Sequence, residues 1–119
     1  MQRLLFLTIS VILFSGQVFG QDESKGCPPI SVVGPAGIVA PGASIQFAVN
    51  ADIFNYGEFE FDWQISGGTL ETERNKPFIT VGTTAADDGT TIKATVMVKG
   101  LHAQCNNTAK YEAVVAFPV

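Results

Sequence analysis

The stretch that decides the fold is Glu-Phe-Glu-Phe-Asp-Trp-Gln-Ile-Ser, residues 58–66. Large apolar side chains alternate here with charged or polar ones, so an extended chain would carry one apolar and one polar face. A strand of this kind has to bury its apolar face against a second layer. We therefore predict a half-buried strand over residues 57–66, with Trp63 as its main core residue.

The same alternation recurs along the chain between turn signals that are rich in glycine, proline and aspartate. Gly67 and Gly68 give the backbone freedom of a tight hairpin turn, and no helix is expected after the first 20 residues. The expected strands are residues 28–33 (resuming at 37–40), 43–50, 57–66, 68–73, 77–81, 90–99 and 108–117. The predicted fold class is all-β, an immunoglobulin-like antiparallel β-sandwich of about seven strands, in which residues 68–73 form strand C′ or strand D.

The beginning of the chain is typical of a secretory signal peptide. Arg3 precedes an apolar run of 11 residues, Leu4 to Phe14, which is shorter than the roughly 20 residues that cross a bilayer. The small residues Val18 and Gly20 fit the sites that a signal peptidase reads. An uncleaved anchor is the alternative, and the early polar residues after the apolar run disfavour it.

The expected organisation is a signal peptide over 1–20, a short polar tail over 21–26 and a sandwich domain over 27–119. We therefore expect a secreted, periplasmic or cell-surface protein with no stable membrane span after cleavage. Cys27 and Cys105 form an even pair in an exported chain, which predicts a disulfide. The alternative is a reactive thiol at Cys105 near His102.

Charge and composition exclude several classes of function. The chain has 7 Lys+Arg against 11 Asp+Glu, so a basic nucleic-acid surface is not expected. His102 is the one histidine, and no nucleophile motif accompanies it. We expect no enzyme, cofactor or zinc site. A small hydrolase is the alternative, and its activity would have to depend on His102.

Several segments resemble bacterial PKD-like and Ig-like extracellular domains over roughly residues 27–119. They are Val39 to Gly42, Phe61 to Thr69 with its tryptophan and glycine-rich turn, Phe78 to Val81, and Asp88 to Val96. The resemblance implies a non-catalytic spacer, or a module that contacts proteins or carbohydrates at a cell surface. The aspartate usual in the turn is replaced by Gly67-Gly68-Thr69.

Acidic side chains along one predicted strand suggest a surface for a cation or a basic ligand, and those of one turn suggest a calcium site. Glu58, Glu60 and Asp62 follow one face of the predicted strand at about 7 Å spacing. The simpler explanation is pairing with Lys93 or Lys99 on the neighbouring strand.

The second set is the turn Asp87-Asp88-Gly89, which together with Asp52 offers oxygen ligands for calcium, although its spacing differs from that of a calcium loop.

The preferred contact site is the loop over residues 52–57, because aromatic residues beside asparagine and glycine are typical of recognition loops. The candidate ligand-binding residues are Phe54, Asn55, Tyr56, Leu101 and His102. The alternative is that Ile53 and Phe54 fold back to cover the core.

The expected function is binding or adhesion to a protein or carbohydrate through these end loops. A structural subunit that joins an envelope or extracellular assembly by edge-strand pairing is the alternative. It would use the last strand, where Val114 and Ala116 interrupt the polar face.

Overall fold

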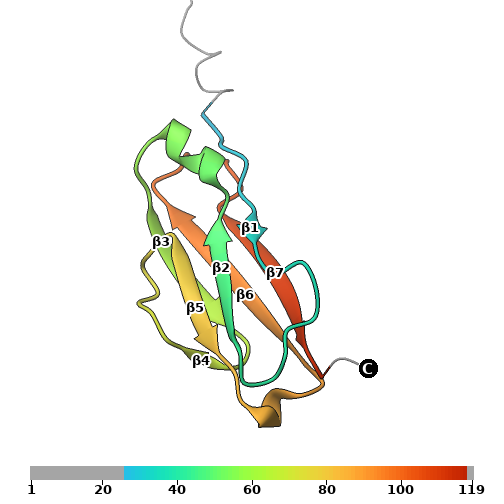
Figure 1. Ribbon diagram of the computed structural model, residues 1–119. Coiled ribbons are helices and arrows are strands. Elements are labelled where there is room, and N and C mark those ends of the chain that lie inside the picture. The colour runs from blue at the N-terminus through green and yellow to red at the C-terminus, as the bar shows by residue number, and fades with distance from the viewer. Residues whose placement is uncertain (1–25, 118–119) are drawn as a thin grey trace, which may run out of the picture.

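The computed structural model describes residues 26–117, so the predicted signal peptide and most of the polar tail lie outside the described residues. The chain forms two packed antiparallel sheets (Figure 1). The strands are β1 (Val32–Val33), β2 (Ser44–Val49), β3 (Glu60–Ile65), β4 (Thr69–Leu70), β5 (Phe78–Gly82), β6 (Thr90–Lys99) and β7 (Thr108–Val115). Two short 3-10 helices, η2 (Ala51–Tyr56) and η3 (Ala85–Asp87), lie in the connections. No helix within residues 26–117 has the length and apolar character needed to cross a membrane.

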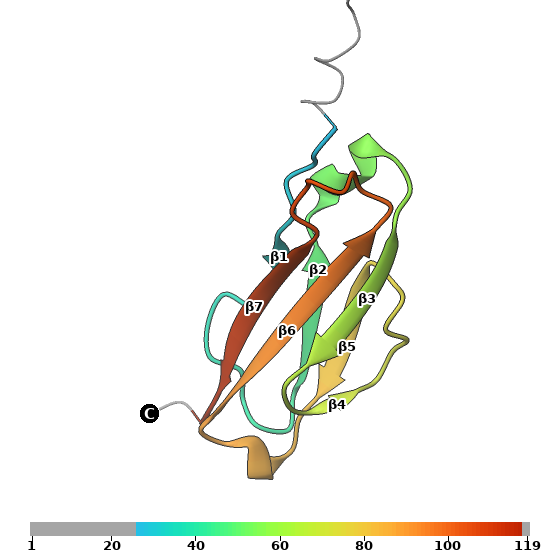
Figure 2. The same cartoon turned by 180° about the vertical axis from the view of Figure 1, so that it is seen from behind.

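The strand order confirms the predicted immunoglobulin-like sandwich. One sheet has the order β1-β2-β5-β4 and the other the order β3-β6-β7. This is the ABED and CFG arrangement of constant-type immunoglobulin domains. Because β4 pairs with β5, the fourth strand is D and not C′. Figure 2 shows the three-stranded sheet from its outer side.

Most strands are shorter than the alternation predicted, although β6 has the predicted bounds. Strand A is reduced to β1 and one isolated bridge at Val39, which pairs with Val115 of β7. Pro35 lies between these two points and has no backbone N–H for a ladder. The expectation of no helix was wrong at η2 and η3, because one or two turns are too short to show a periodic pattern.

Trp63 is the main core residue, as predicted. It lies on β3 opposite Val96 of β6, and none of its side chain is exposed. Its indole Nε1–H donates to the carbonyl of Lys76 at 2.8 Å, so the one polar atom of the ring has a partner. Phe47 of β2 and Ile79 of β5, both in the other sheet, are also fully buried and belong to the same core.

The two-glycine turn exists, but it is not a hairpin. Residues 66–68 connect β3 in one sheet to β4 in the other, because β4 pairs with β5. Gly68 has a φ of +73°, and a Cβ atom there would lie 2.6 Å from Cγ1 of Val81 and 2.8 Å from the carbonyl oxygen of Gly82. Glycine is therefore required both by the backbone conformation and by the close approach of β5.

The predicted disulfide is present. Cys27 and Cys105 are bonded, with their Cα atoms 5.4 Å apart, and the free-thiol alternative for Cys105 is wrong. The bond joins the chain before β1 to the loop between β6 and β7, across a sequence separation of 78 residues. A crosslink over so long a loop removes much of the conformational freedom of the unfolded chain.

Replacing both cysteines by serine should lower the free energy of unfolding by up to about 4.5 kcal/mol, the loop-closure value for this separation. Urea denaturation of the mature chain would measure the change. Reduced wild-type protein is the matched control and should lose the same amount. A loss under about 1 kcal/mol in both would show that the crosslink does not stabilise the fold.

Gly68→Ala should destabilise the protein by about 2–4 kcal/mol, because the new methyl group collides with β5 in addition to straining the backbone. Gly89→Ala is the control, since Gly89 also has a positive φ, +86°, but no atom lies within 4 Å of a Cβ there. It should cost only about 1–2 kcal/mol. Equal losses in thermal or urea unfolding would contradict the packing explanation.

Candidate functional site

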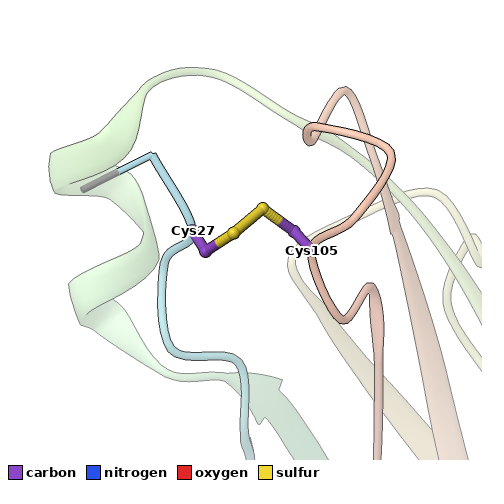
Figure 3. The surroundings of a disulfide bond; sticks show 2 residues. All are labelled: Cys27 and Cys105. Atoms are coloured by element: carbon purple, nitrogen blue, oxygen red, sulfur yellow. A yellow bond between two sulfur atoms is a disulfide. The ribbon is translucent and has the colours of Figure 1, made fainter. Parts of the chain in front are cut away.

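The predicted contact loops lie at one end of the sandwich. The η2 helix follows β2, and the loop over 100–107 follows β6, and both lie at the same end in the two views (Figures 1 and 2). The disulfide ties the start of the domain to the second loop, with η2 beside it (Figure 3). The tertiary structure thus brings the two predicted loops to one end, which we call the disulfide end.

The η2 helix is held from below by a buried side chain. Ile53 is fully buried in the core, and its N–H donates to the carbonyl of Asn50 at 3.3 Å. The prediction that Ile53 covers the core is therefore confirmed. Because a buried isoleucine fixes the middle of this short helix, its remaining side chains are directed outward from a rigid support.

Phe54 and Tyr56 form the exposed aromatic part of the disulfide end. Phe54 is 50% exposed and Tyr56 is 45% exposed, and Asn55 between them is also exposed. One side of the Phe54 ring packs edge-on against Phe61, with ring centroids 6.3 Å apart. The Phe54 ring therefore contacts the core and still presents half of its surface to solvent, and its role in binding stays a prediction.

Phe59 lies between the two loops, a position that the sequence analysis did not assign to it. A Cβ atom on Gly100 would lie 3.4 Å from Cδ1 of Phe59, and one on Gly57 would lie 3.8 Å from its Cζ. Both glycines have positive φ angles, +132° for Gly57 and +106° for Gly100. The half-buried Phe59 ring thus sets the spacing of the loops that lead into and out of the disulfide end.

Asn50 is the second residue of the site that sequence reasoning missed. Its side chain accepts the N–H of Ser31 at 2.8 Å and donates to the carbonyl of Pro29 at 2.9 Å. Its backbone N–H also donates to the carbonyl of Ser31 at 3.0 Å. Three hydrogen bonds therefore fasten the segment after Cys27 to the end of β2. An asparagine that ends a strand was the available signal, but its partners are about 20 residues away in sequence.

The residues predicted on the second loop differ in accessibility. Leu101 is half-buried and packs against the core, so it supports the loop more than it enlarges its surface. His102 is exposed, and its carbonyl accepts the N–H of Cys105 at 3.0 Å. The exposed candidates at this end are therefore Phe54, Asn55, Tyr56 and His102.

The acidic ladder on β3 is only partly matched by lysines. Glu60 lies directly opposite Lys99, as one of the predicted pairings required, but Asp62 lies opposite Met97. On the β3 side Lys93 lies beside Ser66, whose N–H donates to its carbonyl at 3.0 Å, so its predicted pairing with the ladder was wrong. The ion pair found within residues 26–117 lies outside the ladder and joins Lys76 Nζ to Glu73 Oε1 at 3.9 Å.

The proposed calcium ligands do not come together. Asp52 lies on η2 at the disulfide end, whereas Asp87 lies on η3 at the opposite end (Figure 1). Asp87 accepts the N–H of Thr84 at 2.8 Å, and Asp88 accepts the N–H of Phe117 at 3.2 Å. These carboxylates cap η3 and hold the last described residues, so the combined site is contradicted by the fold.

Comparison of the chain with models of known protein families gives no match, and comparison with curated protein sequences gives none either.

Ile53→Ala should lower the free energy of unfolding by about 2–4 kcal/mol, because it empties a fully buried site under η2. Tyr56→Ala, three residues along the same helix, should change it by about 0.5 kcal/mol or less, because half of that side chain is already in water. Urea denaturation of both variants would test this division of roles. Similar losses in the two variants would contradict it.

Proposed function

We propose that this protein is an exported, non-enzymatic Ig-like module that binds a protein or carbohydrate partner at a cell surface through its disulfide end. The observation that carries the proposal is the contrast along η2. Ile53 is fully buried, whereas Phe54 and Tyr56 in the same helix keep about half of their surfaces exposed. Large aromatic side chains on a rigid support contribute much contact area at a small cost in conformational entropy.

The anchoring of this end supports a recognition role. The disulfide, the Asn50 hydrogen bonds and the Phe59 ring hold the segments around η2. A preformed surface loses little entropy when a partner binds. Asn55 and His102 add hydrogen-bonding groups beside the aromatic pair, which suits either a protein or a sugar surface.

Export is supported by two independent features. The predicted signal peptide directs the chain out of the cytosol. The Cys27–Cys105 disulfide is typical of oxidising compartments outside the cytosol. The resemblance to PKD-like and Ig-like extracellular domains agrees with a secreted, periplasmic or surface location.

A catalytic role has little support. His102 is exposed, and the nearby Cys105 is held in the disulfide, so these two residues do not form a nucleophile and base pair. A structural role in which β7 pairs with a strand of another protein also has little support. Val39 already donates to Val114 at 2.9 Å and accepts from Ala116 at 3.0 Å, which covers the apolar part of that edge.

The double variant Phe54→Ser, Tyr56→Ser should reduce binding to intact cells of the source organism by about tenfold or more, because it removes the aromatic contact area. Fluorescently labelled chain 21–119 would be measured by flow cytometry. Phe117→Ser is the control, since Phe117 is 57% exposed and its N–H donates to Asp88. Asp88 follows η3, which lies at the end of the sandwich opposite to η2 (Figure 1). Pretreating the cells with proteinase K or with periodate would distinguish a protein partner from a carbohydrate.

The proposal fails if the wild-type chain does not bind the cells, or if the double variant binds as well as the wild type. Both variants would be checked for a cooperative urea transition above the conditions of the binding assay, because Phe54→Ser also removes the contact with Phe61 and should lower the midpoint. Loss of binding in the Phe117→Ser control as well would also contradict a site at the disulfide end.

A further inference from the structure

The N-terminal strand leaves its sheet and exposes an edge of β2. The β1–β2 ladder consists of the pairs Val32–Val49 and Val33–Ala48. The chain then turns away at Gly34 and Pro35, and Val39 pairs with β7 in the other sheet. Figure 1 shows the connection between β1 and β2 passing beside β2 without joining its sheet. Among the described residues, the first half of β2 therefore has a strand neighbour only on its β5 side.

The backbone groups of this edge point toward the vacated side. The N–H of Asn50 donates to Ser31, on the β1 side, and the N–H of Val49 donates to Pro77, on the β5 side. Hydrogen bonds to one neighbour recur at every second residue of an antiparallel strand, so Ser44 and Gln46 direct their N–H and C=O groups outward. Within residues 26–117, the backbone of Gln46 has no hydrogen-bonding partner across this edge.

An apolar groove lies against the same edge. It has a volume of about 610 Å³, and its lining includes Val33, Pro35, Val39, Gln46, Phe47 and Phe78. This volume is within the roughly 300–1,000 Å³ of ligand pockets. Val33 and Phe78 lie on either side of Ala48 in the register and are 57% and 47% exposed. The row they form with Ala48 is an exposed apolar part of the groove lining.

The far wall of the groove is fixed in place by Tyr111. Its hydroxyl donates to the carbonyl of Pro35, and its ring packs under Gly34, where a Cβ atom would lie 2.7 Å from Cδ1. The ring also contacts Phe47, with centroids 6.1 Å apart. The groove is thus preformed, and an occupant would not have to order this wall.

The residues that line the groove are all uncharged. A carboxylate lies beside one of them, since Glu71 accepts the hydroxyl of Ser44 at 3.2 Å. Residues 26–51, which include β1, β2 and the connection between them, contain no Asp, Glu, Lys, Arg or His. Residues 77–84 around β5 contain none either. The open part of the β7 edge differs, since it bears Lys110 and Glu112. Charged side chains on an edge strand oppose pairing with further strands, and their absence at β2 leaves its edge permissive.

We infer that the edge of β2 at Ser44–Gln46 binds an extended, uncharged segment of another polypeptide as an added strand. Alternating N–H and C=O groups at strand spacing match a peptide backbone, and the apolar walls receive alternate side chains. The neutral lining selects a segment whose inward side chains are uncharged, because a charge buried in the groove would find no partner among the lining residues. This surface is separate from the disulfide end and goes beyond the binding role proposed for it.

The test uses the chain 21–119 labelled with ¹⁵N and an acetylated, amidated Thr-Val-Thr-Val-Thr-Val-Thr peptide as the probe. At about 1 mM peptide, which half-saturates even a site of millimolar Kd, the amide resonances of Ser44 and Gln46 should shift and their hydrogen exchange should slow. A peptide methylated on alternate backbone nitrogens should not bind. The same peptide with lysine in place of valine should bind at least about tenfold more weakly.

Gln46→Pro is the sharpest variant, because it removes an N–H that the fold does not use, and proline is tolerated where that group faces solvent. It should weaken peptide binding about tenfold, whereas Gln46→Thr, which keeps the N–H, should bind as the wild type does. If Gln46→Pro fails to fold, Phe78→Lys replaces it, since that half-exposed side chain lines the groove. Both variants keep Phe54 and Tyr56, so cell binding through the disulfide end should be unchanged.

Three results would overturn the inference. One is the absence of resonance shifts at β2 at the highest peptide concentration. Another is binding that Gln46→Pro and Phe78→Lys leave unchanged. The third is a wild-type dimer in sedimentation velocity that Gln46→Pro dissociates, because a second copy of the chain would then occupy the edge.

Discussion

The burial of Trp63 between the two sheets is the interaction on which the rest of the sandwich depends. Its side chain fills the centre of the core, and its backbone and indole hold the connection between β4 and β5. Trp63 donates its backbone N–H to Arg74 at 3.0 Å, and Arg74 returns a side-chain hydrogen bond to the Trp63 carbonyl at 3.1 Å. The indole bond to Lys76 adds a third attachment. One residue thus supplies core volume and also closes part of the free edge of β3.

The N-terminal segment has the opposite effect, because it leaves an edge open. At its beginning it is tightly held by the disulfide and by Asn50. After Val33 it leaves the first sheet, and at Val39 it covers the end of β7. The same change of sheet that covers β7 uncovers β2. The molecule therefore has two surfaces of different kinds, an aromatic one at the disulfide end and a backbone edge beside an apolar groove.

Local alternation explains how much of the fold could be predicted. In β6 the side chains expected to face inward are buried, and in β3 Phe61 and Trp63 are buried whereas Ile65 is half-buried. The pattern is predictable because the two-residue period is a property of the extended chain itself. The cysteine pair was predicted from parity and export, and the fold brings both cysteines to the disulfide end. The turn at Gly67 and Gly68 was located correctly but assigned to a hairpin. Glycine spacing indicates backbone freedom and does not indicate which sheet the next strand joins.

The exposed aromatic residues of the candidate site were chosen from the sequence, but the residues that support them were not. Phe54 and Tyr56 were chosen from residue type, but η2, the spacing role of Phe59 and the hydrogen bonds of Asn50 depend on partners remote in sequence. The sequence by itself determined which strand faces are apolar, that the cysteines would pair and that the lone histidine has no catalytic neighbours nearby in the chain. Only the tertiary structure decided which strand edges are covered and which aromatic side chains stay exposed. Edge pairing and solvent exposure depend on contacts between segments distant in the chain, and local sequence periodicity carries no information about them.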